Sequence, residues 1–364
     1  MARFLVMQIM ALVVGGILCV DVWAHPPWGI VADRQGQVYF SDLETIWKID
    51  ARGRLSVFRA GVQGKHTHEL AIDDGGNLFG EDLTYDPASQ HNSVAMWRMT
   101  PAGDLSYVLA MTTSPPAGFS LWRDRAGNMY SVKQNQDSPR EILVLKRTSD
   151  GRLVTLQGGT RPPPQERQPI LYSVGGVAFG PDGTIYATDG KNILKITADG
   201  RVSTLARDIS AEGPAAEASE GGAAGRVYGL AVDAQGNVFA ADFNNRRVVK
   251  VAPDGKTTTL LQTESPWSPS GIAISNGELY LLEFGPGPPR PRVQKLAADG
   301  KVTTLATVGE EKIASTGQNE AATVQTPEKS ERPARTYCSV AVALGLIFVA
   351  CAWQLRGALL ALVR

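Results

Sequence analysis

Cysteine is nearly absent from this chain of 364 residues. Only three cysteines occur, at Cys19, Cys338 and Cys351, and none lies in the long stretch between the first and the second. We therefore expect the body of the protein to fold without disulfide bonds. The same absence excludes a thiol nucleophile and a thiolate metal site from that stretch.

The sequence also lacks an excess of charge of either sign. It has 36 basic and 36 acidic side chains, so its formal net charge is zero. This balance gives no electrostatic reason to expect a nucleic acid as a partner. No G-x-S-x-G nucleophile elbow and no phosphate-binding glycine loop before a helix is found either.

The N-terminal segment is typical of a secretory signal peptide. Arg3 precedes an almost wholly apolar run from Phe4 to Val20, and small or medium residues lead up to Ala24. We interpret residues 1–24 as a signal peptide cleaved after Ala24, with an uncleaved anchor as the alternative. The protein is therefore expected outside the cytoplasm, in a periplasm or at a cell surface.

The C-terminal segment is expected to be a membrane anchor. An uncharged run extends from Cys338 to Trp353, and basic residues follow it. A transmembrane helix over residues 337–364 fits this pattern and the preference for positive charge on the cytoplasmic side. The alternative is a terminal helix packed on the domain. Residues 309–336 are polar and lack a strand period, which predicts a flexible stalk.

Between these ends, one pattern occurs six times at intervals of roughly 40 to 56 residues. Each copy is an apolar strand, a tight Asp/Gly/Asn turn and a second apolar strand, followed by two more strands around a glycine turn. The copies begin at Trp28, His68, Phe119, Gly175, Tyr228 and Ser270.

Four-stranded units of this kind cannot bury their apolar faces alone. Packing six of them around an axis buries those faces and leaves only short edges exposed. We therefore predict an all-β protein, with a six-bladed β-propeller over residues 25–308. The copies begin and end in phase, so no N-terminal strand obviously completes the last blade.

The repeats resemble those of the NHL family. Residues 213–255 (GPAAEASEGGAAGRVYGLAVDAQGNVFAADFNNRRVVKVAPDG) match that family's loop and blade almost in full. The chain is more distantly similar to the gluconolactonase/regucalcin-like propellers, which implies a divalent cation held at Glu-Gly, Asn-Gly and Asp-Gly pairs. Here the pairs are Trp28-Gly29, Tyr228-Gly229 and Ser270-Gly271. This departure removes most of the case for lactonase chemistry.

The residues just before each first strand should gather at one mouth of the central channel. Three aromatic residues, a histidine and a serine at this place favour a pocket that packs against a ligand. The predicted ligand-binding residues are Trp28, His68, Phe119, Tyr228 and Ser270.

A second ring follows the second strands and is mostly acidic. It consists of Asp42, Asp82, Lys133, Asp189, Asp242 and Glu283. An acid in this place often caps a turn by accepting backbone hydrogen bonds, and we favour that role. Binding of a cation by the ring is the alternative.

The second copy contains the motif HTHE, at residues 66–69. Two of the four histidines of the chain lie here, followed by Glu69. With the acid ring and the next loop, the sequence predicts a possible site for a divalent metal, zinc or calcium, formed by His66, His68, Glu69, Asp82 and His91. The alternative is that His66 and His68 are exposed loop residues that bind nothing.

From the sequence we expect a membrane-tethered, extracytoplasmic propeller that binds a small molecule or a protein at its channel mouth without catalysis. The alternative is a metal-dependent hydrolase, resembling a lactonase or an esterase, that uses the sector of His66, His68 and Glu69.

Overall fold

The computed structural model describes residues 26–86, 88–89, 91–115, 120–124, 126–134, 141–160, 176–188, 190–198, 201–210, 227–285 and 290–309. The chain divides into two compact units, and residues 25–312 form the unit that contains all of them. The predicted signal peptide and membrane anchor lie outside the described residues. Within the described residues, no helix has the length and apolar character needed to span a membrane.

Six antiparallel sheets make up this unit. Blade 1 consists of β1 (Ile30–Ala32), β2 (Val38–Ser41), β3 (Ile46–Ile49) and β4 (Leu55–Arg59). Blade 2 consists of β5 (Leu70–Ile72), β6 (Leu78–Asp86), β7 (His91–Met99) and β8 (Leu105–Thr112). Blade 3 consists of β9 (Met129–Gln134), β10 (Glu141–Arg147) and β11 (Leu153–Thr160).

The second half of the unit repeats the pattern. Blade 4 consists of β12 (Val177–Phe179), β13 (Ile185–Thr188), β14 (Ile193–Ile196) and β15 (Val202–Ala206). Blade 5 consists of β16 (Val227–Val232), β17 (Val238–Asp242), β18 (Arg247–Val251) and β19 (Thr257–Gln262). Blade 6 consists of β20 (Ser268–Ser275), β21 (Glu278–Phe284), β22 (Arg292–Leu296) and β23 (Val302–Thr307).

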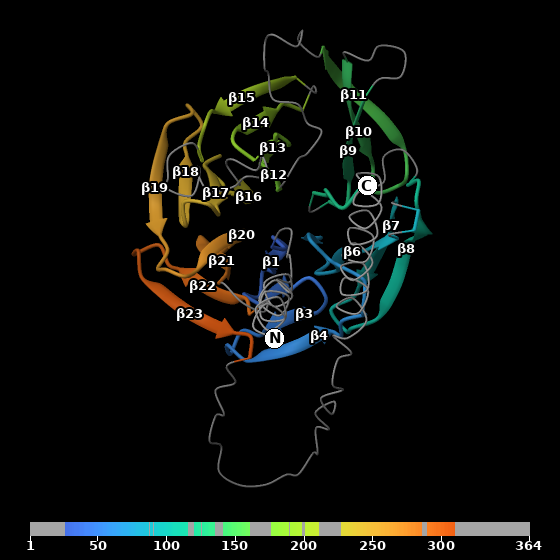
Figure 1. The fold of residues 1–364 in the computed structure, drawn as a ribbon. Helices are drawn as coiled ribbons and strands as arrows, with labels where there is room; N and C mark the ends of the chain where they lie inside the picture. The colour runs from blue at the N-terminus through green and yellow to red at the C-terminus, as the bar shows by residue number, and fades with distance from the viewer. Residues whose placement is uncertain are drawn as a thin grey trace, which may run out of the picture. The chain divides into compact units, whose positions relative to one another are not determined.

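The sheets stand around a common centre, with the first strand of each blade innermost (Figure 1). The predicted all-β six-bladed propeller is therefore confirmed. Blade 3 differs from the expected four-stranded unit. Where the first strand is expected, the described residues form a single β-bridge between Arg123 and Met129. The sheet of blade 3 therefore has three strands.

In blades 1, 2, 3 and 5, an aspartate organises the turn that leads into the second strand. In blade 1 the Asp33 carboxylate accepts hydrogen bonds from the backbone N–H groups of Gln35 and Gln37, at 2.9 and 2.8 Å. Gly36 has a φ of 78°, which glycine adopts at little cost. This explains why an Asp/Gly pattern marks most of these hairpins in the sequence, whereas blade 6 turns at Asn276 and Gly277.

The ring closes by side-chain packing between blades 6 and 1. Phe40 and Val38 of blade 1 share a buried cluster with Tyr280 and Leu282 of blade 6. In addition, the Ser275 hydroxyl donates a 2.7 Å hydrogen bond to the carbonyl oxygen of Asp33, 242 residues away along the chain. Each blade is made of consecutive strands, so closure rests on packed faces and not on a shared strand.

Glycines allow the innermost strands to approach one another near the channel mouth. A Cβ on Gly271 would lie 2.4 Å from the carbonyl oxygen of Trp28, and a Cβ on Gly176 would lie 2.2 Å from that of Tyr228. Such contacts are far too short for any side chain, so this column of the repeat is glycine wherever the neighbouring backbone comes this close. The corresponding residue of blade 2 is Glu69.

Candidate functional site

The acids after the second strands are bonded within the protein. The Asp42 carboxylate accepts a 2.7 Å hydrogen bond from the backbone N–H of Thr45 and another of 2.7 Å from the indole N–H of Trp47. Asp42 therefore caps its own turn, as we favoured from the sequence.

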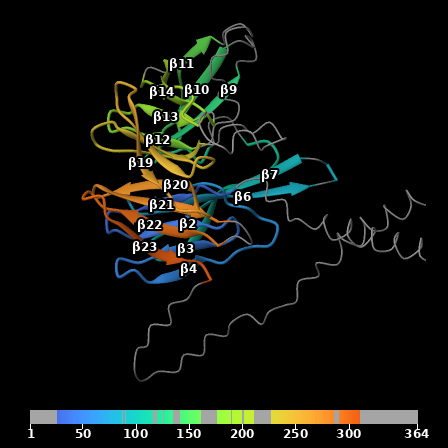
Figure 2. The same ribbon diagram turned by 60° about the vertical axis from the view of Figure 1, so that its left-hand side comes forward.

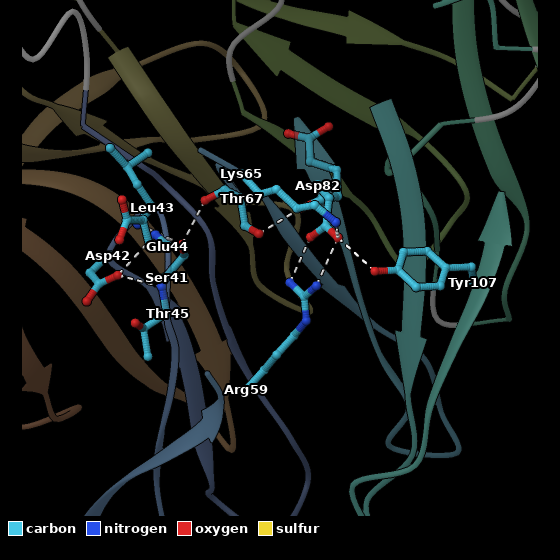
Figure 3. A network of polar contacts seen from close by, with 11 residues as sticks. Ser41, Asp42, Leu43, Glu44, Thr45, Arg59, Lys65, Thr67, Asp82 and Tyr107 are labelled. Atoms are coloured by element: carbon cyan, nitrogen blue, oxygen red, sulfur yellow. Dashed lines mark hydrogen bonds and ion pairs between the residues drawn. The ribbon is translucent and has the colours of Figure 1, made fainter. Parts of the chain in front are cut away.

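Asp82 is fully buried in a network that joins blades 1 and 2 (Figure 3). Its carboxylate forms an ion pair of 2.8 Å with Arg59, and Lys65 lies 3.4 Å away. The Tyr107 hydroxyl donates a 3.0 Å hydrogen bond to it. Burial pushes the pKa of Asp82 up, but Arg59, with Tyr107 and Lys65, outweighs burial and holds this pKa below its ordinary value.

Asp242 and Glu283 are also fully buried, and each is paired with an arginine of its own blade. Arg247 donates from Nε to Asp242 at 2.8 Å, and Arg292 donates from Nε to Glu283 at 2.7 Å. Four of the six ring positions are therefore occupied by acids with structural partners. Asp189 and the side chain of Lys133, which complete the ring, lie outside the described part of the chain.

Three members of the predicted ring, Trp28, His68 and Tyr228, lie together in the fold. Trp28 stacks on Tyr228 with ring centroids 5.7 Å apart and an interplanar angle of 8°, and on His68 with centroids also 5.7 Å apart. Ser270, of the intervening blade 6, is fully buried. Because the residue there is small, side chains from blades 1 and 5 can meet above it. Phe119 and Gly175 lie outside the described residues.

The stacked rings cover one another and so occupy part of the space at the channel mouth. Tyr228 and His68 are buried, whereas Trp28 keeps part of its surface exposed. A ligand at the mouth would therefore contact the exposed part of Trp28 more than the rings of Tyr228 and His68.

The two histidines of HTHE have different surroundings. The His66 side chain is exposed, and its backbone pairs with Leu83 through two hydrogen bonds. His68 is only 5% exposed, and its ring lies edge-on to that of His66 with centroids 5.9 Å apart. The alternative of two exposed loop histidines is thus wrong for His68. Burial, and then the charge of His68, lower the pKa of His66.

The five residues predicted to bind a metal do not come together. His91 pairs with Asp86 near the tip of the β6–β7 hairpin, and its ring nitrogen donates to the carbonyl oxygen of Ser89 at 2.6 Å. Figure 2 shows this hairpin extending past the other strands. Asp82 precedes Asp86 by four residues on β6, so it lies roughly 13 Å along the strand from the position that pairs with His91.

Two members of the predicted set are thus unavailable for a shared metal site. Asp82 is paired with Arg59, and His91 lies near the tip of the hairpin. Within the described residues, no group of three or more His, Cys, Asp or Glu side chains is arranged to hold a metal ion. The predicted set of five is therefore not assembled as a metal site in the described part of the chain.

Glu69 instead belongs to a group that sequence reasoning did not assemble. Its carboxylate accepts a 3.1 Å hydrogen bond from the indole N–H of Trp122 in blade 3. The carboxylate of Glu81, on β6, lies 3.5 Å from Nδ1 of His68. Burial, with the nearby charge of Glu81, raises the pKa of Glu69 to about 8, although the Trp122 hydrogen bond acts against the shift.

These side chains lie where blades 2 and 3 face each other, and this interface differs from the other five. Each of the others is filled by a cluster of buried apolar side chains. No such cluster joins blades 2 and 3 in the described residues. There the buried Arg123 guanidinium lies over the ring of Phe79, 3.9 Å from its centroid.

Among the described residues, two polar atoms that we place in this interface are buried without a hydrogen-bond partner. One is Nε of Arg123, and the other is the hydroxyl oxygen of Ser131. Ser131 follows Tyr130, which packs toward blade 4, so strand alternation turns Ser131 toward blade 2. A signal in the sequence could have pointed here, because Glu69 breaks the glycine column of the repeat.

No family model and no curated protein sequence matches the chain. Several solved structures of β-propellers, in contrast, are similar to this chain in fold. Virginiamycin B lyase from Staphylococcus aureus is 15% identical with a TM-score of 0.41, covering 77% of this chain and 83% of that one. A gluconolactonase from Xanthomonas campestris is 15% identical with a TM-score of 0.47, covering 72% and 84%.

A calcium-binding protein, regucalcin from Agrobacterium tumefaciens, is also 15% identical, with a TM-score of 0.41, covering 71% of this chain and 81% of that one. The chain is thus a six-bladed β-propeller whose structural neighbours include gluconolactonase-like, regucalcin-like and virginiamycin B lyase propellers at low sequence identity. A likeness of this degree says nothing about ligand or reaction.

Proposed function

We propose that this protein binds a small molecule at the mouth of its propeller channel, in the sector formed by blades 1, 2 and 3. One observation carries the proposal. Five blade interfaces are sealed by apolar clusters, whereas the interface of blades 2 and 3 presents ionisable side chains next to the partly exposed Trp28.

Buried polar groups are normally satisfied by a partner, because an unpaired one costs free energy. The Glu81 side chain is 18% exposed, so solvent and solutes can reach it. A few polar groups beside an aromatic surface are what small-molecule sites commonly offer.

We further propose that the protein acts outside the cytoplasm, held at a membrane by residues 337–364 after removal of residues 1–24. The apolar runs at the two ends support this proposal. Fractionation of cells that express the full chain tests it. The chain should stay with the membranes after alkaline washing, and a variant that stops at residue 336 should be released. Recovery of the full chain in the soluble fraction would contradict the anchor.

The binding function is tested by a thermal-shift screen of the full-length chain against neutral and charged small molecules. A ligand of the proposed site should raise the melting temperature of the wild type and of Trp267→Phe, but have less effect on Trp28→Leu or Trp122→Phe. Trp267 is a suitable control because it packs on Arg292 in blade 6. If a ligand raises the melting temperature of all four proteins equally, it binds at a site other than the one proposed.

The same ligands should be recovered unchanged after long incubation with the protein, as shown by mass spectrometry. Conversion of a ligand by the wild type, with loss of conversion in His68→Ala, would instead support the alternative of an enzyme.

A further inference from the structure

Two residues of blade 3, Arg123 and Ser131, break the apolar pattern of the repeat on the face toward blade 2. Arg123 directly precedes the first turn, where the other five copies have a non-polar residue: Ala32, Ile72, Phe179, Val232 and Ile274. Ser131 lies in the second strand, where the other copies also have a non-polar residue: Phe40, Gly80, Ala187, Ala240 and Leu281. Two positions that belong to apolar interfaces elsewhere are therefore polar here.

The strand register brings these two side chains close together. Arg123 pairs with Met129 in an antiparallel bridge, so Ser131, two residues further on, is its diagonal neighbour on the same face. Such neighbours lie about 7–8 Å apart, which a long side chain can span. The Arg123 side chain also turns back along its own strand, because NH2 lies 3.4 Å from the carbonyl oxygen of Ser120. This brings the guanidinium toward the level of Ser131.

Neither side chain is satisfied by the described part of the protein. Nε of Arg123 and the hydroxyl oxygen of Ser131 are buried and have no hydrogen-bond partner there. Arg123 as a whole is only 8% exposed. Buried polar groups normally have a partner, so two orphaned ones on the same face indicate that an acceptor completes this interface.

The charge of Arg123 is not neutralised by an ion pair either. Unlike the three arginines that pair with acids of the ring, Arg123 forms no ion pair with a described carboxylate. The acids whose charges act on it are Asp73 and Asp124, and each is bonded to the asparagine four residues further on in its own turn. Burial lowers the pKa of Arg123 to about 10 although these acids oppose the shift.

We propose that a small monovalent anion, of which chloride is the simplest, binds between blades 2 and 3 and accepts hydrogen bonds from Nε of Arg123 and the Ser131 hydroxyl. The Phe79 ring covers one face of the guanidinium, 3.9 Å from its centroid, but not its N–H edge. An anion in the plane of the guanidinium receives charge-assisted hydrogen bonds from that edge. The site is separate from the ligand proposed at the mouth, because Arg123 adjoins the turn at the other end of its strand.

An anion fits this place better than a water molecule or a larger ligand. A water that accepted both hydrogen bonds would need acceptors for its own hydrogens. Among the described residues, the other buried oxygens without a hydrogen-bond partner belong to Asp82, which faces blade 1, and to Glu283 in blade 6. A halide only accepts. A larger ligand would have to push the two blades apart, because both donors are buried between them.

Melting curves of the full-length chain test the proposal. The protein is heated in sodium chloride or sodium bromide and, at equal ionic strength, in sodium methanesulfonate, whose anion is too large for an enclosed site. The melting temperature should rise by about 2–4 °C for each tenfold increase in halide once the site begins to fill. Methanesulfonate provides the same screening and should give no such rise. An equal rise in both kinds of salt would overturn the proposal.

A double variant, Arg123→Ile with Ser131→Ala, returns both positions to residues that other blades carry, as Ile72 and Ala187 show. It should no longer respond to halide. In methanesulfonate it should melt at least as high as the wild type, because the unpaired buried charge is gone. Arg34→Met, which removes an arginine whose side chain is 62% exposed, should keep the wild-type response.

Two results with the double variant would overturn the proposal. One is a halide response equal to that of the wild type. The other is a melting temperature well below that of the wild type in methanesulfonate, since Arg123 would then be satisfied by the protein itself.

Diffraction from crystals of the full chain grown in bromide locates the ion. An anomalous peak beside Nε of Arg123 is expected, and peaks at the protein surface alone would mean an adventitious ion only and contradict the site. Binding of a ligand at the mouth is read from its dependence on Trp28, so either proposal can fail without the other.

Discussion

Arg59 ends the outermost strand of blade 1, and its guanidinium meets the fully buried carboxylate of Asp82 in blade 2. Both nitrogens of its fork take part, since NH1 lies 2.8 Å from Oδ1 and NH2 lies 2.9 Å from Oδ2. The Arg59 guanidinium also lies over the Trp97 ring, 4.7 Å from its centroid. One arginine thus fixes two neighbouring blades at the rim of the site (Figure 3).

Replacing Asp82 by alanine should lower the free energy of unfolding by about 3–5 kcal/mol, because the buried Arg59 would lose its counter-charge. Asp74→Ala is the matched control. Asp74 also pairs with an arginine of blade 1, at 2.7 Å, but both side chains are at least half exposed, so at most about 1 kcal/mol should be lost. Urea denaturation followed by tryptophan fluorescence measures both. Similar losses in the two variants would contradict the structural role of Asp82.

Gly271→Ala should destabilise the ring at the closure between blades 6 and 1. The added methyl group would lie 2.4 Å from the carbonyl oxygen of Trp28, so the backbone must shift, at a cost of about 1–3 kcal/mol. Gly285→Ala offers the control, because its methyl group would meet atoms no closer than 3.6 Å. The melting temperature should fall clearly in the first variant only. An unchanged melting temperature in Gly271→Ala would show that the inner strands are less tightly packed than described.

The two histidines of HTHE should contribute unequally to stability. His68→Ala removes a buried ring that stacks on Trp28 and should lose about 1–3 kcal/mol. His66→Ala affects an exposed side chain and should stay within about 0.5 kcal/mol of the wild type. Denaturant titrations of the single variants separate the two. Equal effects would mean that both side chains are exposed to solvent.

Stability should depend on pH through Glu69. Its pKa is raised to about 8 in the folded protein, whereas the unfolded chain has the ordinary value of 4.5. Between these values the folded state binds more protons, so the free energy of unfolding must fall as pH rises from about 4.5 to about 8. Glu69→Gln should flatten this decline, while Asp254→Asn, which replaces an exposed acid of blade 5, should reproduce the wild-type curve. Parallel curves for all three proteins would contradict the raised pKa.

Metal content offers a further check on the exclusion of Asp82 from the predicted metal set. Asp82→Asn should leave the zinc and calcium bound to the full-length chain unchanged in mass-spectrometric elemental analysis, because the carboxylate is already engaged by Arg59. A stoichiometric loss of metal in this variant would restore Asp82 as a ligand.

Much of the fold was predictable from local patterns. The Asp33 turn, the alternation of apolar residues in each strand and the recurrence of the unit are written into short stretches of sequence, so six blades could be counted directly. The stacking of Trp28 on Tyr228 also agrees with the predicted aromatic ring. Partners of charged residues could not be foreseen in this way, because the Asp82–Arg59 pair joins different repeats.

The repeat, its register and the side of the channel to which its residues point follow from local backbone preferences and the strand period of two, so they could be predicted from the amino-acid sequence. Which acids are neutralised could not be predicted in this way and is seen only in the folded protein. That outcome depends on distances between blades: Asp82 received an arginine from the neighbouring blade, whereas Glu69, in a column otherwise rich in glycine, met an indole and a second carboxylate.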